Sequence, residues 1–289
     1  MLDLGGSGIS AQGMARFAAS LVSHNTTLHS LCLARNPITG PAGADALADL
    51  ISRSPSLALL NLSTCEIQAS DATVVLAALS DSTALSSFNF EGNAIDPEGA
   101  GKLADYLASP SCRLSYCNIN SNGLGPHGGA LLGHAVAANS SLSAISLAWN
   151  LIGTDGGMAF AAALRANVSL CTLDLRSNGL KYEVGSELFA ALAYNSSLRS
   201  IDLWDNNFGP ENAPAFVNVV HTTTSLRCIH VAGFDIGPCG QALLAALHDN
   251  HAGADCRHEH PADGPDVTDA IRAALESNRS EFNSSAIFD

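Results

Sequence analysis

The chain is short of aromatic and of basic residues, and both shortages restrict what it can be. Aromatic side chains make up 6% of its 289 residues, so a core must be built from Leu, Ile, Val and Ala, within a hydrophobic share of 47%. Lys and Arg number 13 against 27 Asp and Glu, for a formal net charge of −14. Because like charges repel, this balance argues against duplex DNA, RNA and anionic membranes as main partners.

Long apolar runs and signal features are also missing. No stretch of about 18 or more apolar residues occurs, so no membrane span is expected. The segment from Met1 to Gly6 lacks the basic start and apolar run of a secretion signal. The eight cysteines are dispersed, which favours reduced thiols in a cytoplasmic protein. No glycine-rich phosphate loop is present, and we expect no cofactor.

One phrase, L-x-x-L-x-L-x-x-N-x-L/I, recurs every 28 or 29 residues, for example over residues 28–38 and 142–152. In the second case Leu142, Ile145 and Leu147 predict a short strand with one face inward. Asn150 then falls where the chain turns, and its amide can bond backbone groups in a ladder that runs from repeat to repeat. A helix is expected next, with Thr154 or Asp155 as its cap.

The phrase resembles the ribonuclease-inhibitor class of leucine-rich repeats over residues 1 to about 250, including Cys65 at an asparagine position. The resemblance implies an α/β solenoid shaped as a curved horseshoe. Parallel strands would line its concave face and helices its convex face, in about eight full repeats plus degenerate terminal ones. The class includes sensor arms of nucleotide-binding immune receptors, activators of Ran-type GTPases, actin-regulating proteins and ciliary proteins. It therefore implies protein binding without choosing a partner.

Both ends depart from the period. We predict a solenoid over residues 1–253 that starts inside a repeat, a degenerate closing repeat over 254–278, and a flexible tail over 279–289. The incomplete first repeat has no polar cap, so either the native chain is longer or another molecule covers this edge. Self-association through the uncapped N-terminal edge is a reasonable prediction.

Residues between the core leucines should face the concave groove, and they form a gradient. Early repeats place small, mostly neutral residues there. Later repeats carry both tryptophans of the chain and several charges, and Trp and Arg are enriched at interface hot spots. The alternative is that each tryptophan simply packs over a neighbouring repeat. The predicted partner-binding set is Trp149, Asp174, Arg176, Arg199, Asp202, Trp204, Asp205, Arg227 and His230.

Three other patterns could each indicate a functional site or simply serve the fold. Asp174, Asp202 and His230 could support acid–base chemistry, but they could equally form a solvated charge row, and we assign no catalytic residue. The segment 239–260 invites a zinc site, yet its spacings fit no standard pair, and we assign no metal. The N-x-S/T triplets could be glycosylation sites, but the polar turn that ends each helix also produces them, and we favour that structural interpretation. They begin at Asn25, Asn61, Asn139, Asn167, Asn195, Asn278 and Asn283.

These observations predict a non-enzymatic scaffold that binds a protein partner through the concave face and strand-end loops of its later repeats. One alternative is a GTPase-activating protein resembling the Ran activator, for which Arg35, Arg176 and Asn120 are available. Another is the ligand-sensing arm of a larger immune-receptor-like or ciliary protein. The partner itself is not identified by the sequence.

Overall fold

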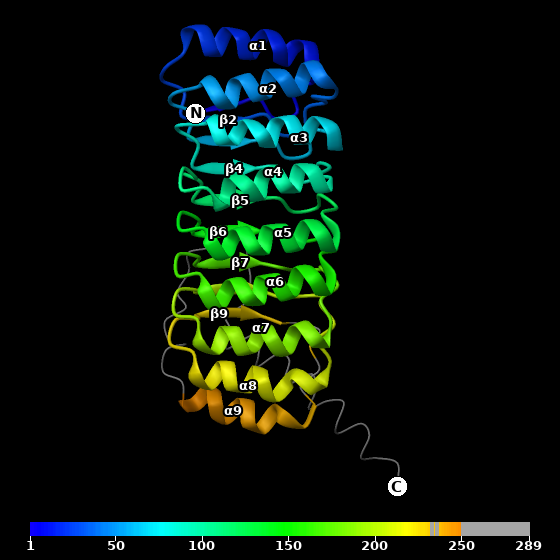
Figure 1. The fold of residues 1–289 in the computed structure, drawn as a ribbon, viewed down its shortest axis with the longest axis vertical. Coiled ribbons are helices and arrows are strands. Elements are labelled where there is room, and N and C mark those ends of the chain that lie inside the picture. Colours follow the sequence, from blue (N-terminus) through cyan, green and yellow to red (C-terminus); the bar gives the residue numbers. More distant parts are fainter. Residues whose placement is uncertain (232–233, 235–236, 250–289) are drawn as a thin grey trace.

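A computed structural model describes residues 1–231, 234 and 237–249, which form one stack of strand–helix units (Figure 1). The strands lie side by side on one face of the stack, and the helices cover the other face. The strands are β1 (Leu2–Asp3), β2 (Ser30–Cys32), β3 (Leu59–Asn61), β4 (Ser87–Asn89), β5 (Tyr116–Asn118), β6 (Ala144–Ser146), β7 (Thr172–Asp174), β8 (Ser200–Asp202) and β9 (Cys228–His230). The α-helices are α1 (Ala11–His24), α2 (Pro41–Arg53), α3 (Ala69–Ala77), α4 (Pro97–Ala108), α5 (Gly125–Ala138), α6 (Gly153–Ala166), α7 (Tyr182–Tyr194), α8 (Ala213–Thr222) and α9 (Gly240–Asp249).

The sheet follows chain order from β1 to β9, and every neighbouring pair is parallel. The register joins equivalent repeat positions, so that Ile145 lies beside Leu173, and Leu173 beside Ile201. These central residues are fully buried against the helices. Residues on either side of them point away from the helices, onto what we call the outer sheet face. The predicted solenoid of parallel strands and covering helices is confirmed.

The asparagine ladder is also confirmed. The amide nitrogen of Asn150 donates to the carbonyl oxygens of Ile119 (2.8 Å) and Leu147 (2.9 Å), in the preceding and the same repeat. Its side-chain oxygen accepts the backbone N–H of Asn122 at 3.0 Å. At the cysteine position, the Cys65 thiol donates to the Leu33 carbonyl at 3.1 Å. The ladder thus satisfies turn backbone that the stacking removes from water.

Helix α6, which follows Asn150 in the chain, begins earlier than expected. It starts at Gly153 and follows Ile152, with no side-chain capping bond, so the prediction of Thr154 or Asp155 as the cap is wrong. Gly153 has a φ of 58°, a left-handed conformation that glycine adopts at little cost. The chain therefore turns directly from the asparagine ladder into the helix, and both polar residues lie within the first helical turn.

Glycines bring α5 and α6 into close contact. A Cβ atom built on Gly133 would lie 2.6 Å from the Cβ and 2.8 Å from the carbonyl carbon of Ala159. On Gly129 it would lie 2.5 Å from the Cβ of Ile152. Real Cβ atoms do not approach other atoms so closely, so these glycines are required by the packing of adjacent repeats.

The predicted structural role of the N-x-S/T triplets holds for Asn139, Asn167 and Asn195. Each follows the last residue of its helix, is at least nine-tenths buried, and accepts backbone N–H bonds two and three residues later. Their amide nitrogens donate to carbonyls of earlier repeats at 2.7–2.8 Å. These nitrogens are engaged in the fold and inaccessible to a glycan.

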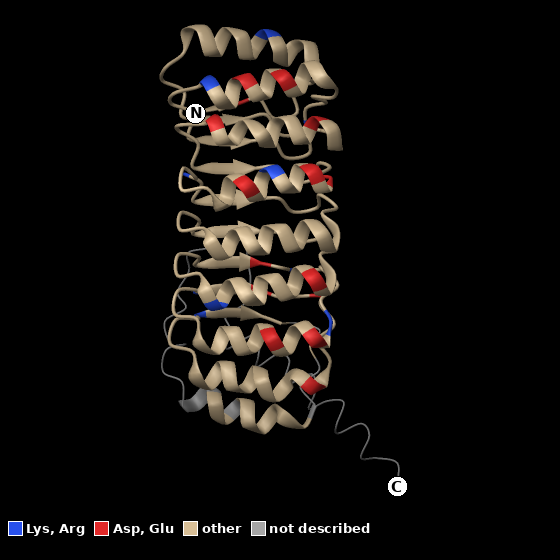
Figure 2. Cartoon of the chain, viewed as in Figure 1, with Lys and Arg blue, Asp and Glu red and all other residues tan. Residues whose placement is uncertain are grey.

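Charge is spread unevenly over the layers. Acidic side chains lie on α2, α3, α4, α6 and α7, with fewer basic ones among them, whereas α5 and α8 carry neither (Figure 2). No helix among the described residues is both long and apolar enough to cross a membrane. The predicted closing repeat (254–278) and tail (279–289) lie outside the described part of the chain.

Candidate binding site at the strand ends

The last residue of each strand forms one row across the outer sheet face. In the later repeats this row contains Asp174, Asp202 and His230, which the register places side by side as the sequence predicts. Asp174 and Asp202 each accept the backbone N–H two residues later, at 3.1 and 3.0 Å. In earlier repeats, asparagines make the same bond at 2.9–3.0 Å: Asn61, Asn89 and Asn118. Because a neutral amide suffices for this turn, the fold does not require the charge of the two aspartates.

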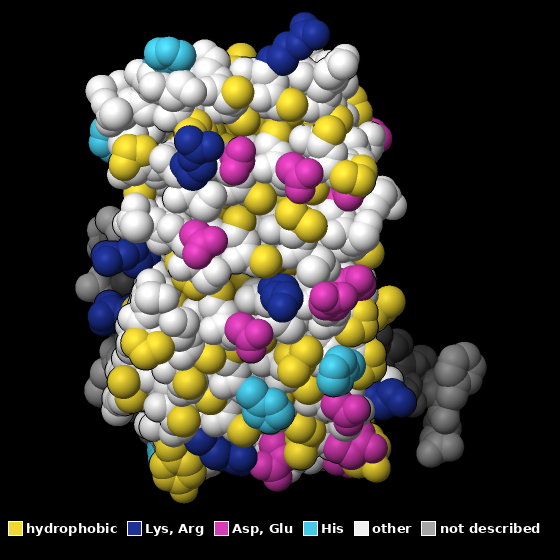
Figure 3. All heavy atoms as spheres, turned by 45° about the horizontal axis from the view of Figure 1, so that its top comes forward, with side chains coloured by type: hydrophobic (Ala, Val, Ile, Leu, Met, Phe, Trp, Pro, Cys, Tyr) yellow, Lys and Arg dark blue, Asp and Glu magenta, His cyan; other side chains and the backbone are white. Residues whose placement is uncertain are grey.

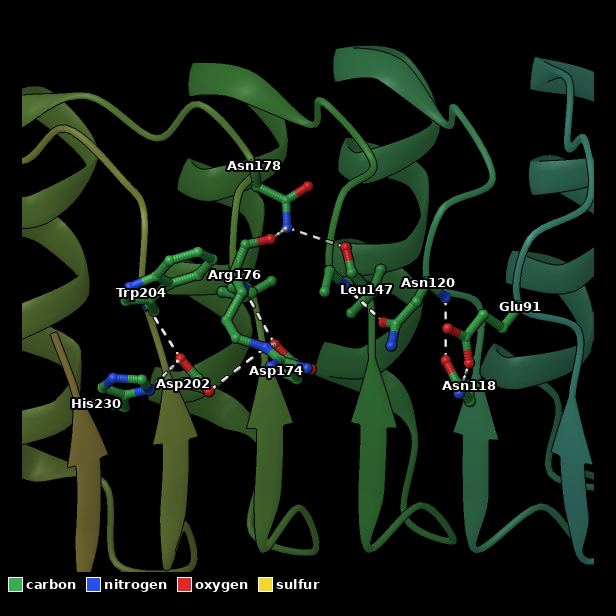
Figure 4. A network of polar contacts seen from close by, with 12 residues as sticks. Glu91, Asn118, Asn120, Leu147, Asp174, Arg176, Asn178, Asp202, Trp204 and His230 are labelled. Atoms are coloured by element: carbon green, nitrogen blue, oxygen red, sulfur yellow. Dashed lines mark hydrogen bonds and ion pairs between the residues drawn. The ribbon is translucent and has the colours of Figure 1, made fainter. Parts of the chain in front are cut away.

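Arg176 forms ion pairs with both of these carboxylates. Its Nε and Nη2 atoms donate to the two carboxylate oxygens of Asp174 at 3.0 and 2.8 Å. The same Nε lies 3.4 Å from a carboxylate oxygen of Asp202 in the next repeat (Figure 4). A two-pronged guanidinium–carboxylate contact fixes direction as well as distance. These contacts raise the pKa of Arg176, chiefly through the bonds to Asp174, although partial burial opposes the shift.

Trp149 completes the surroundings of this guanidinium. The Cζ atom of Arg176 lies 5.7 Å from the centroid of the Trp149 ring, within the range of a cation–π contact. Trp149 is nevertheless 49% exposed. Its φ of 56° is left-handed, as at the equivalent positions Thr64, Ser121 and Ser177. A bulky residue is disfavoured in that conformation, so the turn itself does not explain the choice of tryptophan.

Asp202 also links β8 to β9. One of its oxygens lies 3.2 Å from the Nδ1 atom of half-buried His230. Trp204 follows on the same edge of the sheet, 38% exposed, with its indole turned toward Arg176 (Figure 4). Asp205 is exposed, and it accepts the hydroxyl of Ser177 at 2.7 Å. We call Glu91, Trp149, Asp174, Arg176, Asp202, Trp204, Asp205 and His230 the strand-end patch.

Two of the nine predicted residues lie apart from the patch. Arg199 and Arg227 are exposed just before β8 and β9, at the opposite end of those strands. They are neighbours, since the backbone N–H of Arg227 donates to the Arg199 carbonyl at 2.7 Å. The predicted set therefore divides into a strand-end group and a basic pair at the strand starts.

The prediction also missed three residues that the fold brings to this region. Glu91 accepts the Asn118 amide at 3.0 Å and contributes to the raised pKa of Arg176, from three strands away. Tyr116 lies at an outward strand position between Ser87 and Ala144, and is 36% exposed. Burial, followed by repulsion from Cys117 and Glu91, raises the pKa of its phenol. The sequence signal for Tyr116 was an aromatic residue at a position that the two neighbouring strands fill with Ser87 and Ala144.

Leu151 is the third missed residue. Its side chain is 70% exposed and its φ is 57°. The equivalent positions in neighbouring repeats are the glycines Gly123 and Gly179, also left-handed. The sequence signal was a leucine where the repeat otherwise places residues suited to a turn.

The patch combines carboxylates with one guanidinium and two tryptophans. Asp174 and Asp202 hold a cation, and both stand on an open sheet face, whereas a general acid or base needs a substrate proton within reach. Among the described residues no group of three or more His, Cys, Asp or Glu could hold a metal ion. Of the candidate zinc residues, Cys239 and His248 belong to the described part of the chain, whereas His251, Cys256, His258 and His260 lie outside it.

A separate hollow lies in the helical layer between α1 and α2. It has a volume of about 280 Å³ and an alanine-rich lining that includes Ala18 and Ala46, with Asp45 and Asp49 also facing it. Figure 3 shows this side, where apolar side chains lie between scattered carboxylates. The hollow is far from the strand-end patch in the fold, since the sheet and helices occupy opposite faces.

The comparisons with known proteins agree with this architecture. A family pattern described as Leucine Rich repeat matches residues 24–48 and 138–161. The solved leucine-rich repeat-containing protein LegL7 from Legionella pneumophila is similar over 92% of this chain and 82% of its own, at 16% identity and a TM-score of 0.50. This chain has the leucine-rich-repeat fold. A helix in every repeat and the 28- or 29-residue period are consistent with the ribonuclease-inhibitor type.

Other solved structures are similar at lower TM-scores. An internalin from Listeria monocytogenes shares 19% identity, covering 80% of this chain and 62% of that one, with a TM-score of 0.48. Actin-binding site 2 of Leiomodin-1 shares 14% identity, covering 65% and 96%, with a TM-score of 0.43. A search of curated proteins finds no match. At these identities the likeness concerns the fold alone.

Proposed function

We propose that this leucine-rich-repeat protein is a non-enzymatic scaffold that binds a protein partner through the outer sheet face and strand-end loops of its later repeats. The observation that carries the proposal is the fixed position of Arg176 between Asp174, Asp202 and Trp149 on an exposed face. A side chain held in one geometry loses little entropy on binding, which is the property of an interface anchor.

The contrast between early and later repeats supports the same location. Two residues after the strand end, the repeats of β2 and β3 carry the small residues Ala34 and Ser63. The equivalent positions after β7 and β8 carry Arg176 and Trp204, which are of the types enriched at interface hot spots. The fold tolerates either set, so stability alone does not account for the difference.

The GTPase-activation alternative receives less support. It requires an arginine or asparagine that can reach a nucleotide on a partner GTPase. Arg176 is held by two carboxylates, and the Asn120 side-chain oxygen accepts the N–H of Ala148 at 2.7 Å. Arg35 is exposed in its loop, but no neighbouring feature marks a site there. As part of the proposal we place the scaffold in the cytoplasm, since the seven cysteines of the described residues are free thiols.

The test is capture of partners by the full chain, followed by identification of the retained proteins. Trp204→Ala and Arg176→Ala should lose a partner that the unmodified chain retains. Ser87→Ala on β4 and Tyr194→Ala on α7 are surface controls that should retain it. Equal capture by patch and control variants, with unchanged circular dichroism, would exclude the strand-end patch as the site.

A further inference from the structure

The strand-end patch has an excess of negative charge. It contains the carboxylates of Glu91, Asp174, Asp202 and Asp205 against the single guanidinium of Arg176. Asp174 and Asp202 are partly sheltered from water, so their field is screened less than that of isolated surface charges. A partner that approaches this edge therefore gains from positive charge and loses from negative charge.

Arg176 shows how the patch binds a cation. Its guanidinium is held by carboxylates of two adjacent repeats and lies over the ring of Trp149. Similar components recur one repeat later, where exposed Trp204 stands beside Asp202 and Asp205. The segment at the end of β8 reads Asp202-Leu203-Trp204-Asp205-Asn206 and contains no arginine or lysine. Arg176 lies over the ring of Trp149, and the described residues include no such contact for Trp204. The exposed ring of Trp204 is therefore available to a cation from another molecule.

An apolar contact lies next to this edge. Leu151 projects from the loop that carries Trp149, with 70% of its surface exposed. Its left-handed backbone makes it less favourable there than the glycines of the adjacent repeats. Since the leucine neither fills the core nor suits the turn, its side chain fits a role in contact with an apolar group of a partner.

We propose that the strand-end patch binds a cationic peptide segment in which a lysine or arginine stands close to an apolar residue. The cation lies over Trp204 and beside Asp205 and Asp202, and the apolar residue packs against Leu151 and Trp149. This inference rests on the proposed function and specifies the partner surface. Nucleic acids and anionic membranes carry the same sign of charge as the patch and are disfavoured.

The two tryptophans of the chain are Trp149 and Trp204, so intrinsic fluorescence reports directly on the patch. The probes are short synthetic peptides of equal length with leucine and arginine, leucine and glutamate, or serine and arginine. The leucine–arginine peptide should give a saturable change, with its affinity reduced about tenfold between ~50 and ~300 mM salt. The other two should bind at least about tenfold more weakly.

Two variants test the separate contacts. Asp205→Asn removes the charge and keeps an oxygen for Ser177, whereas Leu151→Gly removes the apolar group and suits the backbone. Each variant should bind the leucine–arginine peptide with an affinity lower by about fivefold or more. Tyr194→Ala, an 88% exposed residue at the end of α7, should leave it unchanged.

Equal binding of the leucine–glutamate peptide, or the absence of saturable binding by the leucine–arginine peptide, would overturn the inference. If those peptides fail while partner capture is still lost in Trp204→Ala, the protein-binding function stands and only the cationic chemistry is wrong. If capture is independent of the patch as well, the proposed function also fails.

Discussion

The guanidinium of Arg176 lies 5.7 Å from the centroid of the Trp149 ring, one repeat away along the sheet. The two side chains come from positions 27 residues apart in the sequence, and Asp174 and Asp202 hold the arginine from its other sides. The network therefore joins three successive repeats on a face that no described segment covers. The contribution of this network to the stability of the fold can be measured separately from its contribution to partner binding.

Removal of the guanidinium should weaken the fold. In Arg176→Ala, Asp174 and Asp202 keep their backbone bonds but lose the cation between them, so the free energy of unfolding should fall by about 1 kcal/mol. Urea denaturation measures this. The control is Arg35→Ala, in an exposed turn, which should stay within about 0.5 kcal/mol of the unmodified chain. Equal effects of both variants would contradict the network's contribution.

Leu151→Gly should stabilise the protein while weakening the proposed partner contact. The leucine is 70% exposed at a φ of 57°, so its removal loses little burial and relieves about 1 kcal/mol of backbone strain. Leu151→Ala is the matched control, because alanine keeps the Cβ atom and with it the strain. Thermal unfolding should rank the glycine variant above the alanine variant, and the reverse order would show that the side chain stabilises the fold.

Gly133→Ala should separate α5 from α6. The added Cβ would meet the backbone of Ala159 at 2.8 Å, and a rigid backbone cannot move aside cheaply, so a loss of about 2 kcal/mol is expected. Gly101→Ala on α4 is the control, since nothing lies within 4 Å of its new Cβ. There the higher helix propensity of alanine should raise stability by about 0.5 kcal/mol or more. Destabilisation of similar size at both sites would refute the packing explanation.

Cys117 should make the protein less stable in alkali. Desolvation raises the pKa of its buried thiol from 9.0 to about 12. Above about pH 9 the unfolded chain releases this proton and the folded chain keeps it, so stability falls as the pH rises. Between about pH 9 and pH 10 the loss attributable to this thiol should approach 1 kcal/mol.

The measurement is urea denaturation at both pH values for the unmodified chain and for Cys117→Ala. The substitution removes the contribution of this thiol, together with its smaller effect on the pKa of Tyr116. Identical pH dependence in the two proteins would mean that the Cys117 thiolate is tolerated in the fold. Alkylation of the native protein at about pH 8 should likewise leave Cys117 unmodified, because the reactive species is the thiolate.

The repeat made much of the fold predictable. Its apolar spacing is local information, and one unit cannot bury its inner face without a neighbour. That reasoning places Leu142, Ile145 and Leu147 inside and Asn150 in the ladder, as the structure has them. The start of α6 was less predictable, because Thr154 and Asp155 have capping side chains while the turn geometry depends on Gly153.

The candidate site was predictable in part. A parallel register aligns equivalent positions, so the row of Asp174, Asp202 and His230 follows from the period. Glu91 could not be assigned in this way, because its effect on Arg176 crosses three strands and depends on where two long side chains point. Leu151 was overlooked because a leucine in an apolar repeat resembles a core residue until its backbone conformation is known.

The sequence by itself determined the order of the strand–helix units, their inner faces and the outward location of both tryptophans, since each follows from a period that neighbouring repeats share. Only the tertiary structure decided which outward residues meet. It separated Arg199 and Arg227 from the strand-end patch and placed Arg176 between Trp149, Asp174 and Asp202. The physical reason is that the register sets the row of each residue, whereas contact between side chains depends on strand spacing, the turn at each strand end and the rotamers that packing permits.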